Sequence, residues 1–101
     1  MEGKFNRIVC TRVLDEVLSE RERQESKWGQ QNHPGSEYLM ILGEEVGEAN
    51  KEYLEEYFLS KQPRPSNEEC PIITYGKYRK ELIQIAAVAV AMVESLDRNG
   101  R

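Results

Sequence analysis

The sequence predicts an all-α fold: a helical bundle with three main helices per chain that is completed by oligomerisation. Three long segments place apolar residues at helical spacing, and breaks that contain proline or glycine separate them. The last segment is apolar on nearly every side, which is typical of a surrounded helix. A chain of 101 residues offers too few helices to surround it. We therefore expect a single domain over residues 1–101 that associates with further copies.

The first expected helix runs from about Arg7 to about Lys27. Two series of apolar residues recur every four positions and form one stripe, Val9, Val13 and Val17 beside Cys10, Leu14 and Leu18. The second half, SERERQESK, has no apolar residue. It is either a solvated helix end or a surface that faces a polar ligand. The break WGQQNHPGS follows, with Pro34 and Gly35 as its strongest turn signals.

The second expected helix runs from about Glu37 to about Phe58, and Ser36 is its expected N-cap. One face of this helix is apolar at helical spacing, through Leu39, Leu42, Val46, Ala49 and Tyr53. Gly43 and Gly47 lower the helix propensity, and their small size would let another helix approach closely.

A long loop is expected over residues 59–74, because three of the chain's four prolines fall there. The third expected helix runs from about Tyr75 to about Asp97, and Asn99 and Gly100 supply its stop. Its run LIQIAAVAVAMV lacks a polar face, so the helix should lie in an interface between copies of the chain.

Composition excludes several classes of function. The formal net charge of −4 argues against general binding to nucleic acid or to anionic membranes. The sequence has no membrane-spanning stretch and no secretory signal. Two cysteines, Cys10 and Cys70, and one histidine do not make a disulfide framework or a zinc site. We expect a soluble, cytoplasmic protein without a nucleic-acid or membrane partner.

The most informative run is LGEEVGEANKE, over residues 42–52. Glu45 and Glu48 are three residues apart, so their side chains project from one helix face, and Glu52 lies between them in angle at the border of the apolar stripe. Lys51 is the only positive charge nearby. Like charges this close repel each other, and a divalent cation with oxygen ligands, such as Mg²⁺, would offset the repulsion.

The third helix supplies a matching pair, Glu81 and Gln84, at the start of its apolar run. If the second and third helices pack antiparallel, these two side chains could face the acids of the second helix and complete a metal site in the bundle. The alternative is that all of them are ordinary polar residues that border the core.

These residues carry a resemblance to the MazG-like nucleotide pyrophosphohydrolases of the all-α NTP pyrophosphatase superfamily. The motif of that family is EExxE, a spacer and then ExxD. The corresponding runs are Glu44-Glu45-Val46-Gly47-Glu48 and Glu81-Leu82-Ile83-Gln84. The similarity extends to KWGQQNHP and ELIQIAAVAVAMVESLDR, and therefore covers most of the chain.

The resemblance implies hydrolysis of (deoxy)nucleoside triphosphates between the α- and β-phosphates, with Mg²⁺ as cofactor and Mn²⁺ as a substitute. By position, the metal ligands would be Glu45, Glu48, Glu81 and Gln84. The implied catalytic acids are Glu45 and Glu48, together with Glu44, which would orient the ligands or help to activate water. Separately from the resemblance, the apolar third helix leads us to expect a homodimer or a homotetramer.

Two features depart from the family pattern. Gln84 replaces the usual aspartate, so the site loses one negative charge, and the spacer between Glu48 and Glu81 is longer than usual. A second hypothesis is therefore a helical nucleotide-binding or regulatory module whose catalysis is weakened or lost. Independently of the resemblance, an acidic protein can meet an anionic triphosphate only through metal ions. The sequence has no P-loop and no Ser/His/Asp or Cys/His set for covalent catalysis.

Five further residues are candidates for substrate binding. Trp28, the only tryptophan, is either a wall for base stacking or an anchor in a core or interface. Gln31 could hydrogen-bond the edge of a base. Lys51, Arg79 and Lys80 are candidate phosphate contacts, and the alternative for each is a solvated charge.

Overall fold

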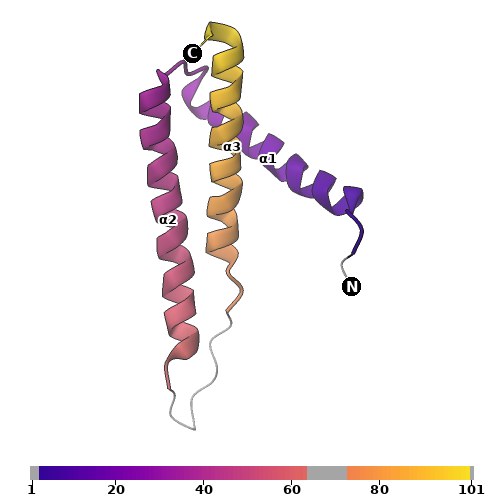
Figure 1. Cartoon of the computed structure of the whole chain (residues 1–101), viewed down its shortest axis with the longest axis vertical. Coiled ribbons are helices and arrows are strands. Elements are labelled where there is room, and N and C mark those ends of the chain that lie inside the picture. The colour runs from indigo at the N-terminus through magenta and orange to yellow at the C-terminus, as the bar shows by residue number, and fades with distance from the viewer. Residues whose placement is uncertain (1–2, 64–72, 101) are drawn as a thin grey trace.

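A computed structural model describes residues 3–63 and 73–100, and the regular structure in these ranges is α-helical throughout. Helix α1 spans Arg7–Trp28, α2 spans Gly35–Lys61 and α3 spans Gly76–Asn99 (Figure 1). The predicted all-α class with three main helices is therefore confirmed. Among these helices, none combines the length and the apolar character needed to cross a bilayer.

The N-terminal end of α1 and the C-terminal end of α3 are capped by standard hydrogen bonds. Asn6 precedes α1, and its side chain accepts a hydrogen bond from the Val9 amide at 3.1 Å, a cap that the sequence analysis missed. Gly100 follows α3 with a left-handed φ of 70° and donates its N–H to the Leu96 carbonyl at 2.7 Å. The predicted stop at Gly100 is confirmed.

Helix α2 begins earlier and ends later than predicted. The prediction of Ser36 as N-cap is wrong, because Pro34 precedes the helix and its carbonyl accepts two amide hydrogens from the first turn, at 3.0 and 3.1 Å. At the other end α2 continues to Lys61, so the first part of the predicted loop 59–74 is helical. Most of that loop, residues 64–72, lies outside the described residues, as does Cys70.

The helices form an antiparallel hairpin crossed by a third helix. Helices α2 and α3 run side by side in opposite directions, and α1 packs against α3 (Figure 1). The N-terminal half of α1 projects away from the hairpin. The connector of residues 29–34 joins α1 to α2 at the end of the hairpin where α3 finishes.

The hydrophobic core within one chain is small. Within residues 3–63 and 73–100, the buried apolar residues are Val17, Tyr38, Ala49, Ala87 and Val88. Most of the predicted apolar stripes stay open to solvent: Leu14 and Leu18 of α1 are 59% and 58% exposed, and Leu39 of α2 is 61% exposed. The free thiol of Cys10 is half-buried in α1. The helices therefore present much more apolar surface than they cover.

Tyrosine rings close the hairpin where α3 begins. The Tyr53 ring stacks on that of Tyr75 with centroids 4.9 Å apart, and it meets the Tyr78 ring edge-on at 5.0 Å. The Tyr57 ring also stacks with that of Tyr53, with centroids 6.2 Å apart. This cluster ties α2 to the start of α3, and with it fixes the register that places the acids of α2 opposite α3.

Candidate functional site

Acidic side chains of α2 and α3 meet across the hairpin. Glu45, Glu48 and Glu52 of α2 lie close enough to the partly buried Glu81 of α3 for their charges to act on it. Burial raises the pKa of the Glu81 carboxyl above its ordinary value of 4.5, and the charges of these three acids and a hydrogen bond with Glu45 raise it further. Four carboxyl groups thus lie close enough to disfavour ionisation of one of them.

Gln84 lies one turn beyond Glu81 and reaches the same place. With its Nε2 facing the acids, its amide donates to Glu81 Oε2 at 3.1 Å and to Glu45 Oε2 at 3.3 Å. The opposite orientation would set Oε1 against two carboxylate oxygens. Antiparallel packing of α2 and α3 therefore brings the predicted ligands Glu45, Glu81 and Gln84 into contact and places Glu48 nearby.

The donor set fits a hard divalent cation in its chemistry. The side chains offer only carboxylate and amide oxygens, which are the ligands that Mg²⁺ takes. The pKa of Glu81 is raised first by burial and then by the neighbouring acids, and a cation would relieve the repulsion in the second part. In residues 3–63 and 73–100, however, no three acidic, histidine or cysteine side chains stand in metal-binding geometry. Ion binding would require these side chains to draw closer together.

A cavity of about 440 Å³ adjoins the acids and is lined by all three helices and by the connector between α1 and α2. Its lining includes Glu45 and Gln84 of the acidic site together with Trp28 and Gln31. The structure thus joins two of the predicted metal ligands and two of the predicted base contacts in one space. This juxtaposition needs the tertiary fold, because Gln31 and Gln84 are far apart in the sequence.

Trp28 is the last residue of α1 and lines this cavity. Gly29 follows it with a φ of 73°, which turns the chain sharply into the connector. The indole is 54% exposed, and the Lys27 ammonium lies 4.6 Å from its ring centroid. Trp28 is therefore not a core plug within one chain, and its ring is accessible to a stacking partner.

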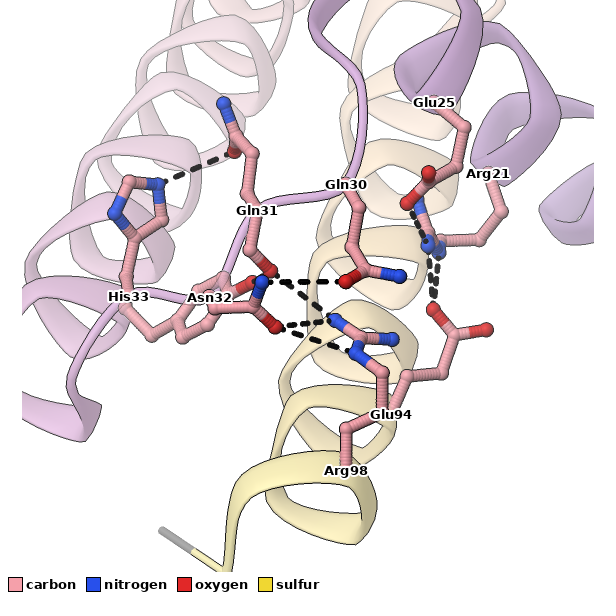
Figure 2. A network of polar contacts seen from close by, with 9 residues as sticks. Arg21, Glu25, Gln30, Gln31, Asn32, His33, Glu94 and Arg98 are labelled. Carbon is pink, nitrogen blue, oxygen red and sulfur yellow. Dashed lines mark hydrogen bonds and ion pairs between the residues drawn. The ribbon is translucent and has the colours of Figure 1, made fainter.

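Arginines that the sequence analysis missed hold the cavity wall together (Figure 2). Arg21 of α1 is only 8% exposed and donates to Glu25 on its own helix at 2.8 Å and to Glu94 of α3. The Arg98 guanidinium donates to the Asn32 side chain at 2.9 Å. Both arginines line the cavity, and so do further residues from the polar half of α1, which therefore faces the cavity as well as solvent.

Tyr38 also fixes the connector beside the cavity. Its ring is 5% exposed, and its hydroxyl donates to the Gln31 carbonyl at 2.9 Å. Arg98 donates to that same carbonyl at 3.2 Å. The Gln31 side chain in turn contacts His33 Nε2 at 3.2 Å (Figure 2). The backbone at Gln31 is thus held from α2 and from α3, which positions its side chain at the cavity.

The predicted phosphate contacts lie elsewhere. Arg79 pairs with Glu16 of α1 at 2.6 Å, and Arg79 and Lys80 line a second groove of about 480 Å³ between α1 and the start of α3. Gln84 lines both spaces. Lys51 and Glu44 are exposed on α2. The roles predicted for these four charged residues stay predictions.

Comparison of the chain with known protein families, with curated proteins and with solved structures gave no match. The comparisons therefore lend no support to the MazG-like resemblance, which stays a prediction. What can be said of function rests on the geometry of the acids and the cavity.

Proposed function

We propose that this chain is a Mg²⁺-dependent nucleoside triphosphate pyrophosphohydrolase that converts a (d)NTP into a (d)NMP and pyrophosphate. The observation that supports this most is the single cavity lined by Glu45 and Gln84 as well as by Trp28 and Gln31. A nucleotide needs a stacking and hydrogen-bonding surface for its base and an oxygen-rich cation site for its phosphates. The cavity of about 440 Å³ has the size usual for a small-molecule site.

In this proposal, different side chains would bind the base and the cation, according to their chemistry. Trp28 offers an exposed ring on which a base can stack, and the Gln31 amide can donate to and accept from its edge. Glu45, Glu48 and Glu81 would hold the cation, and Gln84 would add an amide oxygen. Mg²⁺ bound there would offset the phosphate charge and acidify the attacking water.

Three charged residues take secondary roles in this proposal. Glu44 is next to Glu45 on α2 and is the acid we assign to orienting the ligands or accepting a proton from water. Lys51 and Lys80 do not line the cavity, so they would contact phosphate oxygens only where the triphosphate extends beyond it. Arg79 could join them only by leaving Glu16, with which it now forms a two-bonded pair at 2.6 and 2.8 Å.

A second candidate is a nucleotide-binding or regulatory module that keeps the site without catalysing hydrolysis. Gln84 favours it, since an amide in place of a carboxylate removes one negative charge from the cation site. The variant Gln84→Asp distinguishes the enzyme from the module. A higher turnover in the variant than in the wild type indicates a weakened enzyme. Nucleotide binding without turnover in both the wild type and the variant indicates the module.

We also propose that the functional form is a homodimer or a homotetramer in the cytoplasm, where nucleoside triphosphates are found. The accessible surface of the chain is 7941 Å², against about 5,900 Å² expected for a compact monomer of this mass. The excess of about 2,000 Å² exceeds the roughly 800 Å² that each partner contributes to a standard interface.

The direct test is pyrophosphate release from a panel of standard and modified (d)NTPs with Mg²⁺ or Mn²⁺. We expect release from at least one substrate, and loss of it in Glu45→Gln. Glu55→Gln, which removes the same charge at an exposed position of α2, is the matched control and should stay active.

Absence of release from every substrate, with folded protein and excess metal, would contradict the enzyme. The module would then be tested by melting: a ligand that binds only the native state raises the melting temperature. If neither Mg²⁺ nor any nucleotide shifts it, the chain is a structural bundle and both candidates fail.

A further inference from the structure

The Gln84 side chain joins the acids of two different helices. In the orientation that hydrogen bonding requires, its Nε2 donates to Glu45 Oε2 at 3.3 Å and to Glu81 Oε2 at 3.1 Å. A primary amide has two N–H donors, and both can be used here. Ionised carboxylates can only accept, so when both Glu45 and Glu81 are ionised they repel each other unless a cation or a donor lies between them.

The same amide has an oxygen at its other end. In the orientation just described, Oε1 points away from the acids and cannot ligate a cation held between them. To serve as a ligand, the amide must turn about its last side-chain bond, which exchanges the positions of Oε1 and Nε2. One side chain can therefore support the acids in two ways, but not in both at once.

We infer that Gln84 is a positioning residue with two states. Without a cation it clamps Glu45 and Glu81 through its N–H groups, and when a divalent cation binds it turns its amide and presents Oε1. The second state rests on the proposed function. An aspartate or glutamate at this position could bind the cation more strongly, but could not clamp ionised acids without it.

The clamp is tested on metal-free protein with Gln84→Glu, which is isosteric and nearly unchanged in helix propensity. Asn50→Asp is the matched control, because it makes the same amide-to-acid change at an exposed position of α2. In chelator at neutral pH and at one protein concentration, we expect Gln84→Glu to melt about 4–8 °C below Asn50→Asp. Equal melting temperatures would overturn the clamp.

The turn of the amide is tested with Mg²⁺ alone. By titration calorimetry, we expect Mg²⁺ to bind about fivefold or more tightly to Gln84→Glu and about fivefold or more weakly to Gln84→Met than to the wild type. A merely structural role of Gln84 would weaken both variants alike, so opposite signs are diagnostic. The side-chain NH₂ signals of Gln84, identified by their loss in Gln84→Glu, should shift on saturation with Mg²⁺.

The two halves of the inference fail separately. If wild type binds Mg²⁺ and the Gln84 signals do not move, the amide does not turn and the second state is overturned. If the wild type binds no Mg²⁺, the result contradicts both the metal site of the proposed function and the second state of Gln84. The metal-free comparison with Asn50→Asp then still decides whether the clamp exists.

Discussion

At Glu81, crowding of like charge has a measurable consequence for stability. Burial first, and then the charges of Glu45, Glu48 and Glu52, raise the pKa of the Glu81 carboxyl in the folded protein above 4.5. The folded chain therefore holds this proton more tightly than the unfolded chain does. As pH rises from 4.5 through the raised pKa, ionisation of Glu81 lowers the free energy of unfolding.

Removing that charge should stabilise the metal-free protein. We predict that Glu81→Gln melts about 1–3 °C above wild type in chelator at neutral pH, a small gain because the carboxyl is only partly buried. The difference should vanish as pH falls below the ordinary value of 4.5. Calorimetric melting of both proteins across this pH range checks it. A difference that stays constant with pH would contradict the assignment of the cost to ionisation.

Arg21 shows a different use of charge, as a tie between α1 and α3. The Arg21 side chain is 10% exposed, and its guanidinium is bonded to Glu25 and Glu94, whose side chains are 42% and 43% exposed. We predict that Arg21→Met lowers the free energy of unfolding by about 1–2 kcal/mol, measured in urea, since the partners can recover water. Arg23→Met removes an exposed pair within one helix and should lower the free energy of unfolding clearly less than Arg21→Met does. Equal losses would contradict a tie between helices.

Sequence reasoning could reach the acids but not these arginines, for a physical reason. Spacing along a helix, which is a local property of the sequence, was enough to identify the candidate ligands Glu45, Glu48, Glu81 and Gln84. The bonds of Arg21 to Glu94 and of Arg98 to Asn32 cross 73 and 66 positions of the chain. They depend on how the helices cross, and nothing in the local pattern distinguishes them from solvated charges.

At the scale of elements, the helices themselves were predictable because long apolar periodicity is a strong signal. The ends were less so. Ser36 has good N-cap chemistry, yet the Pro34 carbonyl already accepts the amides of Glu37 and Tyr38, and Ser36 is drawn into the first turn. A helix start depends on which of several neighbouring groups satisfies the free amides, and residue type alone does not decide between them.

The connection between α1 and α2 depends on the backbone of Gly29. Its φ of 73° and ψ of −173° lie in a region that only glycine adopts readily. An added Cβ would meet no atom within 4 Å, so the cost of Gly29→Ala is conformational. We predict that Gly29→Ala loses about 1–3 kcal/mol in the free energy of unfolding. Because Trp28 and Gln31 flank this turn, we also expect nucleotide to raise the melting temperature of the variant less than that of the wild type.

Gly43→Ala on α2 is the informative contrast. An added Cβ there also meets no atom within 4 Å, but the backbone is helical, so this variant should gain about 0.5–1 kcal/mol by urea denaturation. A loss of stability at Gly43 would instead show that a partner's helix packs against this position. A rise in the free energy of unfolding of Gly29→Ala would contradict the conclusion that this turn is strained for residues other than glycine.

At the scale of the whole molecule, one chain does not close a core. Its radius of gyration is 17.7 Å and its longest extent is 59 Å, whereas a compact chain of this length has a radius of about 13 Å. Exposed apolar residues lie on all three helices, among them Leu18 at 58%, Met40 at 68% and Val93 at 55%. So large an apolar surface is typical of chains that associate.

The exposed apolar residues of α1 offer a way to test that association. We predict that Leu14→Lys with Leu18→Lys lowers the mass measured by light scattering toward the 11.7 kDa of one chain, whereas the wild type gives twice that or more. Glu22→Lys, at an exposed polar position of α1, makes the same net change in charge and should leave the mass unaltered. If the oligomer holds the fold together, the wild-type melting temperature also rises with protein concentration, and that of the double variant does not. A wild type of 11.7 kDa with a concentration-independent melting temperature would show that the elongated chain is stable alone, and the surface argument for a homo-oligomer would then be wrong.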